Sequence, residues 1–225
     1  MGIIKKIQND TELFELMQGR LYTAVCSDVM DDLGYYEQAM RPNIRPIKED
    51  YVVIGRAKTV LAMDIYHVND NPYELEIKAI DSVKSGEVVV GCTNNSSRNS
   101  LWGELLSTAT QARGGTGAVI DGLARDILKI RAIGFPVFAV GYKPVDSRGR
   151  GKVVDYDCPV MCGDVLVRPG DLIFGDFDGV LVIPKDIAEE VVVSALDKVD
   201  RENLTREGLL KGRLLADMYR EFGVL

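Results

Sequence analysis

Histidine is nearly missing from this chain of 225 residues, and its scarcity narrows the chemistry that the chain can carry out. The single His67 would have to serve any Ser-His-Asp or Cys-His nucleophile system. Because it lies in a polar stretch with Asp64, Asp70 and Pro72, we interpret it as a loop histidine and not as a general base. The sequence therefore disfavours nucleophilic catalysis of the protease type.

Cysteine is also sparse, with four residues at Cys26, Cys92, Cys158 and Cys162. They form no Cys-x-x-Cys pair, and one histidine cannot complete a standard zinc site. We therefore expect reduced structural thiols. A redox role for Cys158 and Cys162, which flank residues 159–161, is the less favoured alternative.

Long apolar runs and an excess of basic charge are missing as well. No window approaches the roughly 18 uninterrupted apolar residues of a membrane helix, and the N-terminus lacks the apolar region of a secretory signal. Acidic residues outnumber basic ones by 34 to 27, a net charge of -7, which disfavours nucleic acid and anionic membranes as partners. We expect a cytoplasmic protein that binds neither.

Two glycine-containing segments could be mistaken for nucleotide-binding motifs. Residues 114–117, Gly-Gly-Thr-Gly, precede a predicted strand, and no lysine follows them as it does in a phosphate-binding loop. Residues 176–179, Asp-Phe-Asp-Gly, lack the other protein-kinase motifs and are better read as a hairpin turn. Neither segment predicts nucleotide binding.

The composition that is present, 46% hydrophobic and 27% charged, is that of a soluble globular protein. One domain is the simplest interpretation at this length, although two small domains are possible. Periodicity, glycine and proline predict helices beginning at Asp10 and covering 23–34, 74–83, 101–112 and 127–133. They predict strands at 51–62 with a glycine break, 86–90, 118–120, 136–141, 151–154, 165–167, 172–176 and 179–184.

The last forty residues, 185–225, read as a helical arm with one apolar face. Such an arm could cover the core of its own chain or pack on a neighbouring subunit. No repeat or low-complexity linker separates it from the rest.

The most informative segment runs from Trp102 to Asp126. The strand at 118–120 is expected to open into a loop at Asp121, and Arg125 and Asp126 then lie where a short helix begins. Twenty residues separate Glu104 from Arg125. Arginine can bind a substrate carboxylate, and aspartate can hold a hard cation such as Mg²⁺. The alternative is a capping carboxylate beside a solvated charge.

These motifs resemble those of the RraA-like family, which includes 4-hydroxy-4-methyl-2-oxoglutarate/4-carboxy-4-hydroxy-2-oxoadipate aldolases. The matching segments span most of the chain in the expected order: 25–34, 102–106, 117–122, 125–126, 135–138, 170–171 and 178–180. Its aldolases are marked by an acidic residue, twenty intervening residues and Arg-Asp, a spacing that Glu104, Arg125 and Asp126 reproduce.

The resemblance implies an α/β fold with a β/β/α sandwich of the swivelling-domain type, N-terminal helices and a projecting C-terminal helix. It implies one RraA-like domain over 1–225, with 185–225 as its arm. It also implies a homotrimer or homohexamer with the active site at a subunit interface. The activity it implies is class II aldol cleavage that yields pyruvate, with oxaloacetate decarboxylation as related chemistry.

The resemblance further assigns roles to individual residues. Asp126 would hold Mg²⁺, Mn²⁺ or another divalent metal, and Arg125 would bind the pyruvyl group and stabilise the enolate. Glu104 would orient a water on the metal or assist proton transfer. Glu202 is a candidate contribution from a neighbouring subunit. The backbone amides at the start of the predicted helix would receive the substrate carboxylate: Gly103, Glu104, Leu105 and Leu106.

One residue departs from the family pattern, since many of the aldolases have aspartate where this chain has Glu104. The longer side chain could alter the rate or the range of substrates. Two alternatives stay open: a related enzyme with another keto-acid substrate, and a non-catalytic regulator that binds an RNA-degrading endonuclease. The Glu104, Arg125 and Asp126 set favours the enzyme, because a binding protein has no chemical need for that spacing.

Overall fold

The computed structural model describes residues 7–224. The chain forms two compact units, one from the described parts of 1–36 and 186–225 and the other from Glu37–Lys185. The boundary at Lys185 coincides with the predicted start of the C-terminal arm. The expectation of a single domain stays a prediction.

The first unit is helical. Its helices are α1 (Asp10–Met17), α2 (Thr23–Asp32), α6 (Ala188–Leu210) and α7 (Leu215–Phe222). Asn9 caps α1 by accepting a hydrogen bond from the Glu12 amide, and Lys198 of α6 pairs with Asp28 of α2 at 2.9 Å. The arm is helical as predicted but not continuous, because Gly212 adopts a left-handed conformation (φ 82°) between α6 and α7.

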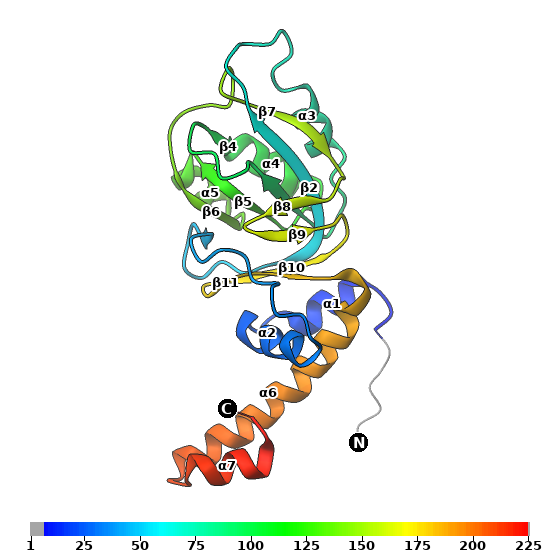
Figure 1. The fold of residues 1–225 in the computed structure, drawn as a ribbon, viewed down its shortest axis with the longest axis vertical. Coiled ribbons are helices and arrows are strands. Elements are labelled where there is room, and N and C mark those ends of the chain that lie inside the picture. The colour runs from blue at the N-terminus through cyan, green and yellow to red at the C-terminus, as the bar shows by residue number, and fades with distance from the viewer. Residues whose placement is uncertain (1–6, 225) are drawn as a thin grey trace. The chain divides into compact units, whose positions relative to one another are not determined.

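The second unit is built on a nine-stranded mixed sheet (Figure 1) with the strand order β1-β6-β5-β3-β2-β10-β11. Strand β4 pairs with β5, and β7 pairs with β2. The strands are β1 (Arg45–Pro46), β2 (Val53–Asp64), β3 (Glu87–Cys92), β4 (Ser100–Trp102), β5 (Gly117–Ala124), β6 (Val137–Tyr142), β7 (Gly151–Tyr156), β10 (Leu172–Asp176) and β11 (Gly179–Ile183). A separate hairpin joins β8 (Val160–Cys162) and β9 (Val165–Val167).

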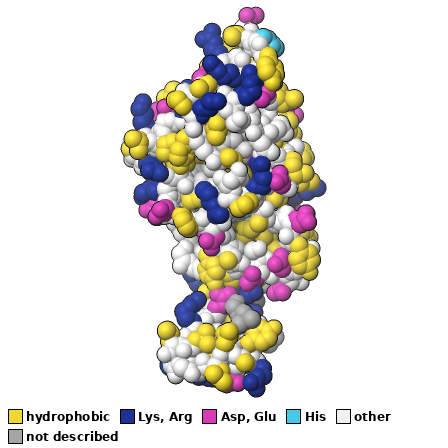
Figure 2. Space-filling model, turned by 60° about the vertical axis from the view of Figure 1, so that its left-hand side comes forward, with side chains coloured by type: hydrophobic (Ala, Val, Ile, Leu, Met, Phe, Trp, Pro, Cys, Tyr) yellow, Lys and Arg dark blue, Asp and Glu magenta, His cyan; other side chains and the backbone are white. Residues whose placement is uncertain are grey.

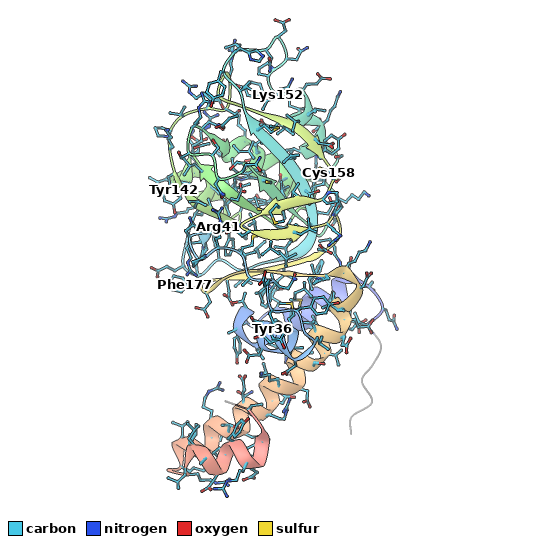
Figure 3. The ribbon with its side chains drawn as sticks, viewed as in Figure 1. Tyr36, Arg41, Tyr142, Lys152, Cys158 and Phe177 are labelled. Atoms are coloured by element: carbon cyan, nitrogen blue, oxygen red, sulfur yellow. The ribbon has the colours of Figure 1, made fainter. Side chains whose placement is uncertain are left out.

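The two ends of the sheet path approach each other, so the sheet is nearly closed. Arg45 of β1 donates hydrogen bonds to the carbonyls of Phe177 and Asp178, in the turn between β10 and β11. Phe177 is labelled at that turn in Figure 3. This turn is the hairpin that the Asp-Phe-Asp-Gly segment predicted.

Helices α3 (Glu74–Asp81), α4 (Glu104–Ala112) and α5 (Ile127–Ile133) complete the second unit, and the parallel strands β3, β5 and β6 form its interior. Most of their side chains are buried, because strands with both faces covered carry continuous apolar runs. Fully buried members include Val88, Val90, Val119, Ile120, Val137 and Phe138. The mixed α/β class and the long C-terminal helix are as predicted.

Two predicted boundaries are wrong, and both lie beside the candidate site. Strand β5 does not open into a loop at Asp121 but continues to Ala124, because the Thr93 amide and hydroxyl both donate to the buried Asp121 carboxylate. That pairing lets a charged side chain remain inside the sheet. Similarly, residues 101–102 extend strand β4 instead of starting the helix.

Strand β2 also differs from its prediction, since it runs through Gly55 without a break. A Cβ atom there would lie 2.5 Å from the Gly86 carbonyl oxygen, so the glycine permits close approach of backbone and not a turn. None of the helices within 7–224 is long and apolar enough to cross a membrane.

Candidate active site

A cavity of about 400 Å³ lies in the second unit, where α3, β4, α4 and the segment after β5 meet. Every candidate site residue that belongs to the second unit lines this cavity: Gly103, Glu104, Leu105, Leu106, Arg125 and Asp126. Helix α3 and the loop after β6 add further lining residues, among them Tyr73, Glu76, Ile77 and Asp146. The structure thus brings together residues from four separate segments.

The first turn of α4 forms one side of the cavity. Gly103 is its N-cap and supplies no side-chain cap, so the amides of Leu105 and Leu106 keep their hydrogen-bonding capacity. Buried Trp102 fixes this turn, because its indole donates to the Ser107 hydroxyl at 2.8 Å, which in turn donates to the Gly103 carbonyl at 3.0 Å. A helix N-terminus of this kind favours a bound anion.

Asp126 stands at the start of α5 as predicted, in a left-handed conformation (φ 61°) that aspartate tolerates better than most residues. Its side chain does not cap α5. Instead, Oδ2 accepts from the amide of Glu104 at 3.4 Å. The carboxylate is 40% exposed, so it faces the cavity with capacity for further ligands.

Arg125 is held between two carboxylates. Its Nη2 lies 3.0 Å from Oδ1 of Asp146, and its Nε lies 3.8 Å from Oδ2 of Asp126. The backbone continues the β4–β5 ladder, because the Arg125 amide donates to the Trp102 carbonyl at 2.9 Å. The guanidinium is therefore oriented, while a side-chain exposure of 36% leaves it open to a ligand.

Glu104 projects from the first turn of α4 and is partly exposed. Its Oε1 accepts a hydrogen bond from the Thr108 hydroxyl at 2.9 Å, one helical turn along. The position is compatible with the proton-transfer role that the resemblance implies.

The sequence analysis does not identify three of the titratable residues that line the cavity: Tyr73, Glu76 and Asp146. Tyr73 donates a hydrogen bond to Asp146 Oδ2. Burial alone would raise the pKa of Asp146, but bonds from Tyr73 and the Arg148 amide, together with the charge of Arg125, lower it. Asp146 is therefore an ionised support for Arg125.

Glu76 has a different environment on α3. Burial, reinforced by the charge of Asp146 and opposed by that of Arg125, raises its pKa to about 7. A sequence signal existed, because Glu76, Ala79, Ile80 and Val83 are spaced as one helix face and the last three are buried. A carboxylate on an otherwise apolar face is a candidate functional group.

The carboxylate oxygens in the cavity suit a hard cation that takes only one or two ligands from the protein. No group of three His, Cys, Asp or Glu side chains suited to a metal occurs within 7–224. Mg²⁺ does not need one, since it keeps several waters and commonly binds one or two carboxylates together with a substrate. Asp126 is such a carboxylate, because it is partly exposed in the cavity and accepts a hydrogen bond from the Glu104 amide.

The other candidate residues are not among those that line this cavity. His67 is exposed in the loop between β2 and α3. Glu202 lies on α6 in the helical unit and accepts a hydrogen bond from Tyr22; burial and that bond raise the pKa of Tyr22 to about 12. The structure of the described chain gives Glu202 this partner only, and its assignment to a neighbour's site stays a prediction.

The cysteines are free thiols, and three are buried. Burial, followed by the charge of Asp121, raises the pKa of Cys92 to about 11 and that of Cys162 well above its usual value. Cys158, labelled in Figure 3, is half-buried, and burial raises its pKa too. High thiol pKa values disfavour nucleophilic or redox chemistry, in line with the structural interpretation.

Charges of both signs occur on the molecular surface. Figure 2 shows Lys and Arg side chains over the face in view, among Asp, Glu and hydrophobic side chains. The acidic balance of the sequence therefore does not make this face uniformly negative, and anionic ligands are not repelled from all of it.

Comparison with known proteins places the cavity within a matched region. A sequence model of the RraA-like family, described as Aldolase/RraA, matches residues 23–182. A protein of Halalkalibacterium halodurans named "Putative 4-hydroxy-4-methyl-2-oxoglutarate aldolase" is 32% identical over 209 residues, covering 92% of this chain and 94% of the relative. Every residue that lines the cavity lies inside the matched region.

Solved structures share the fold over nearly the whole chain. One described as novel cellulases from microbes of the gut ecosystem has a TM-score of 0.82 and 33% identity, covering 91% of this chain and 90% of that chain. Streptomyces coelicolor RraAS2, described as an unusual member of the RNase ES inhibitor RraA protein family, has a TM-score of 0.78 and 28% identity, with coverage of 90% and 99%. The names of these relatives refer to different activities.

Proposed function

The chain belongs to the RraA-like family, and on that premise we propose that it is a divalent-metal-dependent class II pyruvate aldolase. Its substrate is 4-hydroxy-4-methyl-2-oxoglutarate or a similar 4-hydroxy-2-keto acid. The aldolase name of the relative from H. halodurans supports a carbon-carbon lyase. Because the names of the relatives refer to different activities, we choose between these functions from the chemistry of the cavity.

The observation that carries the proposal is the meeting of Arg125, Asp126 and the N-terminus of α4 at one cavity. Arg125 supplies a positive charge for a substrate carboxylate, and Asp126 supplies an oxygen ligand for a metal. The amides at the N-terminus of α4 supply a second contact for an anion. A volume of about 400 Å³ suits a small organic acid.

Substrate binding follows from the orientation of these groups. The amides of Leu105 and Leu106, which have no intrahelical acceptor in the first turn of α4, receive the C1 carboxylate. Arg125 holds the keto-acid end and, as charge develops on the C2 oxygen, stabilises the enolate. Asp146 keeps the guanidinium in position for both contacts.

A divalent cation held by Asp126 and chelated by the 2-keto acid would polarise the C2 carbonyl and stabilise the enolate charge. Glu104 then accepts the proton of the C4 hydroxyl, either directly or through a water. The electrons of the C3–C4 bond pass into the enolate of pyruvate as C4 becomes a carbonyl. Oxaloacetate reaches the same enolate when it loses CO₂, so decarboxylation is expected as a second activity.

The assembly proposed with this function is a homotrimer or homohexamer, with Glu202 of a neighbouring subunit contributing to the site. Exposed apolar side chains on the helical unit, such as Leu210, Leu214 and Tyr219, support an arm that packs on another subunit. Light scattering of the purified protein measures this directly, and a monomer would remove both ideas.

A second candidate function is a regulator that binds an RNA-degrading endonuclease without catalysis. It is favoured by the likeness to RraAS2, at 28% identity over 90% of this chain. The test that separates the two is pyruvate release from 4-hydroxy-4-methyl-2-oxoglutarate and from oxaloacetate, with Mg²⁺ and with EDTA. We expect Mg²⁺-dependent release from at least one; release from neither would reject the aldolase and favour the regulator.

A further inference from the structure

A carboxyl group that the mechanism above leaves unused, Glu76, faces the substrate cavity from α3. The same side chain also lines a small apolar cavity beneath it, of about 10 Å³. The neighbours there are almost entirely apolar: Val60, Ala79, Ile80, Val89, Gly91, Leu101, Trp102, Leu106, Ile120 and Val153. Glu76 therefore stands at the boundary between the substrate space and the core.

The carboxyl groups in the substrate cavity differ in their partners. Glu104 accepts from Thr108, Asp126 from the Glu104 amide and Asp146 from Tyr73. Within residues 7–224, no hydrogen bond or ion pair joins the Glu76 carboxyl to another group. A half-buried carboxyl without donors is poorly stabilised as an anion and retains its proton more readily.

The charged and titratable groups that share the cavity with Glu76 are Tyr73, Glu104, Arg125, Asp126 and Asp146. Burial has the largest effect on Glu76, the Asp146 charge adds to it and Arg125 opposes it, which gives a pKa of about 7. An acid with such a pKa can donate a proton at neutral pH and recover it from water.

We propose that Glu76 is the acid that delivers a proton to C3 of the pyruvate enolate. This inference rests on the proposed aldolase function and assigns the step that follows carbon-carbon cleavage. The enolate double-bond electrons form the new C3–H bond, the C2 oxygen returns to a carbonyl, and Glu76 is left as a carboxylate. As the product leaves, exchange with solvent returns a proton to Glu76 and removes the proton that Glu104 took from the C4 hydroxyl, so the cycle balances.

Two of the carboxyl groups in the cavity, Glu104 and Glu76, then have separate tasks. Glu104, half-exposed and hydrogen-bonded, takes the proton from the C4 hydroxyl, whereas Glu76 supplies one to C3. Pairs of carboxyl groups in contrasting environments are a common way to obtain a base and an acid in one site. The reverse of the Glu76 step removes a methyl proton from pyruvate itself.

The reverse step supplies the experiment, because it can be followed without a carbon-carbon bond being cleaved. Pyruvate with Mg²⁺ and the full-length protein in D₂O is monitored by proton NMR for loss of the methyl signal. We expect the exchange rate of Glu76→Gln to fall at least 100-fold. Oxalate, a planar analogue of the enolate, should bind this variant within about threefold of the wild type.

Glu74→Gln is the matched control, since Glu74 lies on the same helix but is exposed and paired with Lys78 at 2.7 Å. It should exchange pyruvate protons at the wild-type rate. Exchange by Glu76→Gln within threefold of the wild type, with oxalate binding intact, would overturn the inference. A purely structural role of Glu76 would weaken oxalate binding and exchange together, and that result also counts against it.

A second measurement requires neither metal nor turnover. Carbon-13 NMR of side-chain carboxyl groups in the metal-free protein should show one group that titrates near pH 7 and disappears in Glu76→Gln. No such group would overturn the inference. The two proposals fail differently: a wild type with neither cleavage nor exchange rejects both, whereas exchange that is independent of Glu76 rejects only this one.

Discussion

The cavity has two walls with opposite physical character. The α4–α5 wall, formed by residues 103–106 with Arg125 and Asp126, presents charges and amides, and the side chains of Arg125 and Asp126 are 36% and 40% exposed. The α3 wall, formed by Glu76 and Ile77, places one carboxyl against apolar core. The difference teaches that one cavity can hold one carboxyl open to a ligand and another against apolar core, where burial favours the protonated acid.

The largest effect should come from removing the metal ligand of the α4–α5 wall. Asp126→Ala is expected to reduce Mg²⁺-dependent pyruvate release by at least about 1000-fold, because one carboxylate provides the protein's main hold on the cation. Turnover and calorimetric Mg²⁺ binding check this. Asp70→Ala, an exposed loop substitution, serves as the control. Undiminished turnover in Asp126→Ala would remove this residue from the mechanism.

Arg125→Ala tests the anion-binding half of the same wall. We expect kcat/KM to fall about 100-fold, chiefly through KM and enolate stabilisation, since a charge-assisted contact to the keto acid is lost. The variant also leaves Asp146 without its 3.0 Å partner. Arg125→Lys should recover part of the loss but not the forked geometry. Steady-state kinetics that match the wild type would contradict the assignment.

The α3 wall predicts a pH effect on stability. The folded-state pKa of Glu76 is raised to about 7 from 4.5, so the folded state binds more protons and loses stability as pH rises from about 4.5 to 7. Glu76→Gln should therefore unfold with a free energy roughly 2 kcal/mol higher at pH 8, with no such gain at pH 4. Urea unfolding at both pH values measures it; an equal change at both would refute the environment described for Glu76.

Gly103→Ala should have the smallest of these effects. A Cβ at position 103 would lie 3.0 Å from Oδ2 of Asp126 and 3.4 Å from Nε of Arg125, so both side chains must shift slightly. We expect about a tenfold loss of kcat/KM with little change in thermal stability, because misplacement within a site costs rate more than folding. Full activity in this variant would show that the α4–α5 wall tolerates more freedom than its geometry suggests.

Sequence reasoning anticipated the α4–α5 wall better than the α3 wall. Arg125 and Asp126 lie at a helix start, and Glu104 opens α4, because glycine, charge and apolar spacing act locally. The strand end was misplaced at Asp121, since Asp-Gly resembles a turn and the stabilising donor, Thr93, is 28 residues away. Local rules cannot supply such a partner.

Two features near the α3 wall differ in how far the sequence could predict them: the contact between Asp146 and Arg125, and the position of Glu76. The support of Arg125 by Asp146 depends on the loop after β6 returning to β4, where Ser100 and Asp146 form an isolated bridge. Nothing near position 146 in the sequence indicates that contact. Glu76 was accessible, because it shares a helix face with Ala79, Ile80 and Val83, all buried.

The most direct test of the central claim is the binding of oxalate, the planar analogue of the pyruvate enolate, measured by titration calorimetry with and without Mg²⁺. The account predicts binding that is at least about tenfold tighter with Mg²⁺ in the wild type and that loses this dependence in Asp126→Ala. Binding that is absent, or that depends on neither the metal nor Asp126, would contradict the claim that the cavity stabilises a pyruvate enolate with the help of a divalent metal that Asp126 would hold.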